Sequence, residues 1–145
     1  MAGAAFQGLE WAATTFGLEP TWTLEPDLEA AKQIVKEHSI RFTKFPCNKN
    51  EQTLILRLAL PVDPRYKTLS EVATMEWMRH NANVPVPTVV SHDASSANPV
   101  GFEWILMTKL PGKQLADAWR SLSYPAKEGL AKPFAKYSSS LFKIS

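Results

Sequence analysis

The sequence predicts an α+β fold in which a short antiparallel sheet packs against one helix and is followed by further helices. Apolar side chains alternate along residues 53–60, and branched and aromatic side chains gather along 102–108, as they do in strands. A helix pattern over 68–80 lies between these two strands. The predicted order of elements, α, β, α, β, β, α, α, lacks the regular strand–helix alternation of a doubly wound sheet. With 145 residues, the chain is long enough for one domain with a modest core.

Residues 1–23 are expected to form a loosely ordered N-terminal arm, because glycines and other small residues are frequent there. The aromatic residues of this arm, which are expected to attach it to the domain, are Trp11, Phe16 and Trp22. A helix is then predicted from Pro26 to about His38. Proline fits the first turn of a helix, and acidic residues cluster at the positive end of this helix's dipole.

One face of this first helix is predicted to be buried, because apolar residues recur on it at helical spacing. These residues are Leu28, Ala31 and Val35. Residues 40–52 are predicted to be irregular, since a proline and two asparagines interrupt any periodic pattern.

The strand over 53–60 directs leucines to one face and Arg57 to the other, where Ile55 and Ala59 flank it. The next helix, over 68–80, begins with Thr-x-x-Glu. Thr68 and Glu71 therefore have the spacing of a capping box.

A strand is predicted over 84–90, where Pro85 and Pro87 favour an edge position or a late start. A polar turn over 91–101 leads to the strand over 102–108. A short helix is predicted over 115–122, and Ser123 is expected to cap a last helix. Pro133 should kink or split that helix. Its apolar stripe consists of Leu130, Phe134, Tyr137 and Leu141.

Composition excludes several classes of function. The net charge of +2 is close to balance and the lysines are scattered, so neither a nucleic-acid partner nor a membrane surface is predicted. The lone Cys47 excludes an internal disulfide and a cysteine-based zinc site. No apolar run approaches the length of a membrane span, and no basic leader opens the chain, so a cytoplasmic protein is expected. No metal site or catalytic histidine is predicted, because the three histidines share no ligand spacing.

Arg57 and Glu71 are the candidate site residues that the pattern itself suggests. In phosphoryl transfer, a strand cation holds the nucleotide phosphates and a helix carboxylate orients that cation. Glu71 lies fourteen residues after Arg57 and could reach it. The spacing alone leaves simpler interpretations open. Arg57 could be an ordinary surface arginine, and Glu71 could serve as the capping residue of its helix.

The order of basic strand residue, helix glutamate and strand exit is that of a kinase-like small lobe. In patches from residue 24 to about 144, the sequence closely resembles the aminoglycoside phosphotransferase-like family, which also includes choline kinases. The densest matches are LRLALPVDP at 56–64, SEVATM at 70–75, VPVP at 84–87, NPVGFEWILM at 98–107 and LPG at 110–112.

The resemblance implies a truncated kinase-like small lobe over 24–110, followed over 111–145 by the hinge and the first helices of a large lobe. It implies ATP and Mg2+ as cofactors and phosphorylation of a small-molecule hydroxyl as the family reaction.

The resemblance also implies roles for five nucleotide-binding residues. Arg57 stands where the family keeps its phosphate-holding cation, usually lysine, and Glu71 stands at its helix partner. Met107 takes the gatekeeper position before the hinge. Thr108 and Leu110 would offer a backbone carbonyl and a backbone amide to the adenine edge.

The sequence departs from the family pattern in two respects. No glycine occurs between Gly17 and Gly101, although the family places a flexible hairpin turn over the triphosphate. The catalytic aspartate in its His-x-Asp pattern and the later metal-holding aspartate are also missing, so no catalytic residue is assigned.

We therefore expect a fragment of a phosphotransferase-like protein that is inactive as this chain alone. The alternative is a non-catalytic interaction or regulatory module. Such a module would bind a partner, or a second copy, through the exposed edge of the strand over 53–60 and through the uncovered apolar stripe of the last helix. An incomplete product without a function of its own is the third interpretation.

Overall fold

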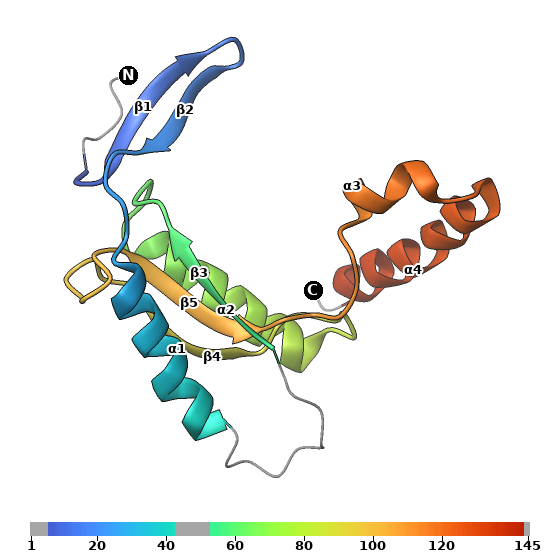
Figure 1. Ribbon diagram of the computed structural model, residues 1–145. Helices are drawn as coiled ribbons and strands as arrows, with labels where there is room; N and C mark the ends of the chain where they lie inside the picture. The colour runs from blue at the N-terminus through green and yellow to red at the C-terminus, as the bar shows by residue number, and fades with distance from the viewer. Residues whose placement is uncertain (1–5, 43–52, 144–145) are drawn as a thin grey trace.

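The computed structural model describes residues 6–42 and 53–143 of the chain. Its centre is a three-stranded antiparallel sheet with the order β3-β5-β4, made of β3 (Leu54–Ala59), β5 (Glu103–Thr108) and β4 (Val89–Asp93). Helix α1 (Leu28–Phe42) lies on one face of this sheet and helix α2 (Tyr66–Asn81) on the other (Figure 1). The predicted α+β class, with a short antiparallel sheet and packed helices, is confirmed.

The hydrophobic core lies between α1 and the leucine face of the sheet. Ala31, Val100, Trp104 and Leu106 are its buried members, and the leucines of β3 pack against them. Because side chains alternate along a strand, Trp104 and Leu106 face α1 while Ile105 faces α2. Ile105 is also buried, so the central strand β5 is covered on both faces.

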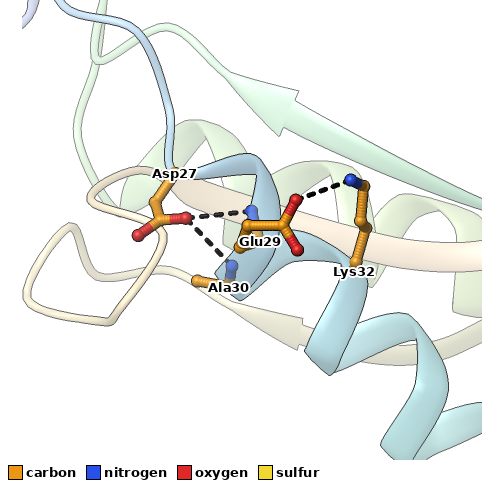
Figure 2. A network of polar contacts seen from close by, with 4 residues as sticks. All are labelled: Asp27, Glu29, Ala30 and Lys32. Atoms are coloured by element: carbon orange, nitrogen blue, oxygen red, sulfur yellow. Dashed lines mark hydrogen bonds and ion pairs between the residues drawn. The ribbon is translucent and has the colours of Figure 1, made fainter.

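Helix α1 begins after Asp27, which caps it. The Oδ1 atom of Asp27 accepts hydrogen bonds from the backbone N–H groups of Glu29 and Ala30 at 2.9 and 3.0 Å (Figure 2). Glu29 also forms an ion pair with Lys32 at 2.7 Å, one turn further on. These contacts satisfy two backbone donors at the helix start.

The predicted buried face of α1 is partly wrong. Ala31 is buried and Val35 is half-buried, but Leu28, the first residue of the helix, is 63% exposed. The helix also continues past His38 to Phe42, into the segment predicted to be irregular. The remainder of that segment, 43–52, lies outside the described residues.

The N-terminal segment contains a hairpin that the sequence analysis did not predict. β1 (Leu9–Thr14) pairs with β2 (Gly17–Trp22) in antiparallel register, and the hairpin projects away from the main sheet (Figure 1). Gly17 has a φ of 125°, a conformation that favours glycine, and it pairs with Thr14 to close a two-residue turn. The expectation of a loosely ordered arm is therefore wrong for Leu9–Trp22.

The base of the hairpin is attached to the domain through Phe102. The ring of Trp22 meets the ring of Phe102 edge-on, with centroids 4.7 Å apart. Gly8 lies so close that a Cβ atom added there would stand 2.8 Å from the Phe102 ring. The predicted attachment of the arm by an aromatic side chain is confirmed for Trp22.

The other boundaries differ from prediction for local reasons. Strand β4 starts at Val89 rather than at 84, because Pro85 and Pro87 carry no N–H for pairing, and it is an edge strand of the described sheet. The predicted short helix is split into α3 (Leu115–Ala118) and a 3-10 turn, Trp119–Ser121.

The last helix, α4 (Tyr124–Phe142), is capped as predicted, with Ser123 Oγ accepting a hydrogen bond from the Ala126 N–H. It is not split at Pro133, which lies inside it. Its apolar stripe is poorly covered by the described residues: Phe134 is 58% exposed and Leu141 38% exposed, while Leu130 and Tyr137 are half-buried.

We expect α4 to exchange its amide hydrogens well before the sheet does. No residue of α4 is buried, and Pro133 removes one backbone donor from its interior, which costs roughly 3 kcal/mol relative to alanine. Hydrogen exchange followed by mass spectrometry should show 124–142 opening on the order of ten- to a hundredfold more often than 103–108. Pro133→Ala should slow exchange in α4 and leave the sheet unchanged. Equal protection of α4 and the sheet in the native chain would contradict this expectation.

Candidate functional site

Arg57 of β3 and Glu71 of α2 form an ion pair on the α2 face of the sheet. The Nη1 atom of Arg57 lies 2.6 Å from Oε2 of Glu71, and Nη2 lies 3.1 Å from Oε1, so the pair is bidentate. The side chains are 45% and 28% exposed, respectively. The predicted pairing is confirmed: Arg57 lies at the surface, as the simpler interpretation expected, but it is paired with the helix glutamate.

The strand alternation explains why Arg57 faces α2. Leu56 and Leu58 pack against the core on the α1 face, so Arg57 between them must point to the opposite face. There it stands across from Ile105 of β5, while Ile55 stands across from Met107. The guanidinium therefore lies on an apolar surface that one helix carboxylate borders.

Helix α2 begins earlier than the capping-box pattern predicted. It starts at Tyr66, so Thr68 is already inside the helix, where it is fully buried. Its hydroxyl has no hydrogen-bond partner among the described residues. The capping box is therefore wrong, and the Glu71 carboxylate, now in the second turn, is engaged by Arg57 instead.

A long-range hydrogen bond lies at the start of α2. Arg65, the residue before the helix, has a φ of 69°, which is unusual for a residue with a side chain. Its N–H donates to Oε1 of Glu103 at 2.5 Å, and the Glu103 side chain is only 4% exposed. Through this hydrogen bond, Glu103, the first residue of β5, is connected to Arg65 and so to the start of the helix that carries Glu71.

The sequence analysis missed Glu103, although a signal for it exists. A lone carboxylate in the otherwise apolar run from Phe102 to Met107 has to be buried with a donor or turned to solvent. Which donor meets it depends on how α2 packs on the sheet, and strand periodicity does not contain that information.

The three predicted hinge residues lie at the end of β5. Met107 is half-buried and lies between Ile55 and Val89 of the neighbouring strands. Thr108 ends the strand and is half-buried, and Leu110, beyond the sheet, is 42% exposed. Met107 shares the face of Arg57, so the structure brings Arg57, Glu71 and Met107 to one side of the sheet, with Thr108 and Leu110 at its exit.

Two surface hollows found among the described residues lie elsewhere. One is lined by Asn83–Pro85 and by Lys132, Pro133, Lys136 and Tyr137 of α4, and the other lies between the start of α1 and residues 96–102. Within the described residues, no group of three or more His, Cys, Asp or Glu side chains is placed to hold a metal ion. None of the helices described is long and apolar enough to cross a membrane.

An antiparallel sheet with a strand cation, a helix glutamate paired to it and a strand running out into a Pro-Gly turn define a kinase-like small lobe. The family model described as "Phosphotransferase enzyme family" matches residues 37–136. The chain belongs to this phosphotransferase family.

The curated relatives are fungal proteins. The chain is 42% identical over 77 residues to a subtelomeric hrmA-associated cluster protein of Aspergillus fumigatus. This match covers 52% of this chain and 15% of the relative. It is 27% identical over 107 residues to the "Altered inheritance of mitochondria protein 9, mitochondrial" of Kluyveromyces lactis, covering 65% of this chain and 17% of the relative. The protein of the same name from Candida glabrata is 30% identical over 78 residues, which is 50% of this chain and 12% of the relative. The chain thus spans less than a fifth of the length of these relatives, and no solved structure matches it significantly.

Proposed function

We propose that the chain supplies the small-lobe half of an ATP site, in a protein whose family reaction is phosphorylation of a small-molecule hydroxyl. The bidentate contact between Arg57 and Glu71 carries this proposal. In it, Arg57 binds the phosphates of Mg2+-bound ATP, and Glu71 holds the guanidinium in place. Met107 borders the adenine, while the Thr108 carbonyl and the Leu110 N–H meet its edge.

Arginine can serve both partners at once. A guanidinium has five N–H donors, and the contact with Glu71 uses one on each terminal nitrogen. Three donors remain for phosphate oxygens, which planar guanidinium groups bind well. The side chain is 45% exposed, so a ligand can reach it.

We also propose that the chain by itself binds ATP without transferring phosphate. Phosphoryl transfer needs a base or positioning residue and metal ligands in addition to a phosphate clamp. After Leu110, the sequence offers one aspartate, Asp117, and no histidine. Neither the substrate hydroxyl nor the Mg2+ ion has an assigned protein partner in this proposal.

Titration of the 145-residue chain with Mg2+-ATP, followed by calorimetry, tests the site. Arg57→Ala should weaken binding about tenfold or more, because it removes charge-assisted contacts to phosphate. Arg79→Ala is the matched control, since Arg79 is an exposed arginine of α2 paired with Glu76 at 3.7 Å. Equal affinities of the native chain and Arg57→Ala would refute the site. Transfer of labelled phosphate to an aminoglycoside or choline-like alcohol by the native chain, lost in Arg57→Ala, would refute the proposed inactivity.

A second candidate function is an interaction module, which the position of β3 favours. β3 is an edge strand of the described sheet, with β5 on one side, and its Ile55 side chain is 41% exposed. An open edge rich in leucine and isoleucine is a template for pairing with another strand. In this proposal the partner is a second copy of the chain.

We expect concentration-dependent self-association of the isolated chain. In sedimentation velocity, the average mass should rise toward that of two chains as the concentration increases. Ile55→Lys should restore the monomer, because a lysine on an edge strand opposes pairing. Leu69→Lys, which changes another exposed apolar residue, is the control and should leave the association intact. A monomer at all concentrations would remove the support for the interaction module.

A cytosolic location remains a prediction. The mitochondrial designation belongs to the yeast relatives, of which the chain covers only a small share.

A further inference from the structure

We propose that the Thr108 hydroxyl is a positioning group that keeps the carbonyl of its own residue free to accept the 6-amino group of adenine. This inference rests on the proposed ATP site and adds to it a reason why the end of β5 prefers adenine. It is carried by the hydrogen bonds that join Thr108 to Thr88.

The peptide groups of Thr108 point toward the β4 side of the sheet. Thr108 and Leu54 are opposite each other in the β3–β5 register, and the Lys109 N–H donates to the Thr53 carbonyl at 2.8 Å. In an antiparallel ladder, this bond makes Leu54 and Thr108 a non-hydrogen-bonded pair. The N–H and carbonyl of Thr108 are therefore not used by β3.

On the β4 side, one of the two possible ladder bonds is formed. The Thr108 N–H donates to the Thr88 carbonyl at 3.0 Å. An ordinary antiparallel pair would return this bond, from the Thr88 N–H to the Thr108 carbonyl. Instead, the Thr88 N–H donates to Oγ1 of Thr108 at 2.9 Å.

The hydroxyl therefore takes the donor that would otherwise occupy the carbonyl. Among the described residues, no donor is found for the Thr108 carbonyl oxygen. The preceding residue on the β4 side, Pro87, has no N–H to offer. At the end of β5, the Thr108 carbonyl therefore has no donor among the described residues, while the Thr88 N–H beside it is already bonded to the hydroxyl.

An unused carbonyl selects a ligand edge that donates. Adenine presents an amino group at C6, whereas guanine presents an oxygen at that position and would meet the carbonyl with a second acceptor. The hydroxyl acts only through the carbonyl, so Thr108 is a positioning residue for base recognition.

Thr108→Val tests the arrangement without any nucleotide. Valine keeps the branched shape but has no oxygen, so the Thr88 N–H should move to the residue-108 carbonyl. Scalar coupling across that hydrogen bond, measured by NMR between the Thr88 nitrogen and the residue-108 carbonyl carbon, should be absent in the native chain and in Thr108→Ser. It should appear in Thr108→Val. Coupling in the native chain, or none in Thr108→Val, would overturn the inference even if ATP binds.

Binding then tests the functional half. ATP and purine riboside triphosphate, which lacks the 6-amino group, should differ in affinity for the native chain and Thr108→Ser by about five- to tenfold, the value of one hydrogen bond. In Thr108→Val, the difference should shrink, because the carbonyl oxygen then also accepts the Thr88 N–H, while the affinity for purine riboside triphosphate changes much less. A preserved difference in Thr108→Val, or equal losses for both nucleotides, would overturn the proposal. If neither nucleotide binds the native chain, the proposed ATP site fails and this role fails with it, whereas the coupling measurement reports on the hydrogen bond alone.

Discussion

Leu106→Ala is expected to lower the free energy of unfolding by about 3–5 kcal/mol. Leu106 has no exposed surface, and it lies in the central strand between two neighbouring strands and beneath α1. Truncating it removes apolar contacts and leaves a cavity beside Ala31, Val100 and Trp104. Because the free energy of unfolding of a domain of this size is small, much of the variant should be unfolded at room temperature.

Urea denaturation followed by far-ultraviolet circular dichroism measures this loss. Leu106→Met, which nearly conserves volume, should cost less than about 1.5 kcal/mol and so keeps the test informative if the alanine variant does not fold. Leu110→Ala is the control at an exposed leucine, 42% accessible, and should change stability by no more than about 0.5 kcal/mol. Similar losses at positions 106 and 110 would show that the sheet is not the centre of the core.

The sheet and its helices were predictable because local pattern determines them. The alternation along 53–60 placed Arg57 on the face opposite the leucines, and β3 has that arrangement. The start of α4 was predicted from Ser123, because a serine side chain can accept a hydrogen bond from a backbone N–H at the start of a helix. In both cases the information lies within a few residues of the feature.

The features that the sequence analysis missed depend on contacts between distant segments. The β1–β2 hairpin requires Gly17 to adopt a positive φ and its base to pack on Phe102, which lies about eighty residues along the sequence from Trp22. Local glycine content alone suggested disorder instead. Local pattern likewise favoured Thr68 as a cap, whereas α2 begins at Tyr66, after Arg65, whose N–H donates to Glu103 of β5.

The candidate site shows the same division. The sequence order of Arg57 and Glu71 suggested their pairing, and the structure brings them together. The bond between Thr88 and the Thr108 hydroxyl had no sequence signal, since it depends on the register in which β4 meets β5. The face on which each side chain of a strand lies can be predicted from the sequence. The residue that it contacts on a neighbouring strand depends on the register and cannot.

Glu103→Ala is expected to cost about 2–3 kcal/mol of stability and to disturb the position of Glu71. The variant leaves the partly buried N–H of Arg65 without its carboxylate acceptor, and hydrogen bonds to charged groups contribute about 1.5–3 kcal/mol. Since Arg65 immediately precedes α2, losing this contact should also free the first turn of the helix. Glu71 lies one turn further along, so its contact with Arg57 should become less well ordered.

Two further variants separate the loss of the hydrogen-bond acceptor from the effect of the positive φ at Arg65. Glu103→Gln keeps an oxygen acceptor and should lose less stability than Glu103→Ala. Arg65→Gly keeps the N–H and relieves the positive φ of 69°, so it should be neutral or stabilise the chain by up to about 1 kcal/mol. Unfolding in urea gives the stabilities, and the NMR signals of the Arg57 side-chain N–H groups report on the contact with Glu71. If Glu103→Ala were as stable as the native chain with unchanged Arg57 signals, α2 would be held by its packing on the sheet alone. Glu103 would then have no part in placing the carboxylate that the proposed phosphate site requires.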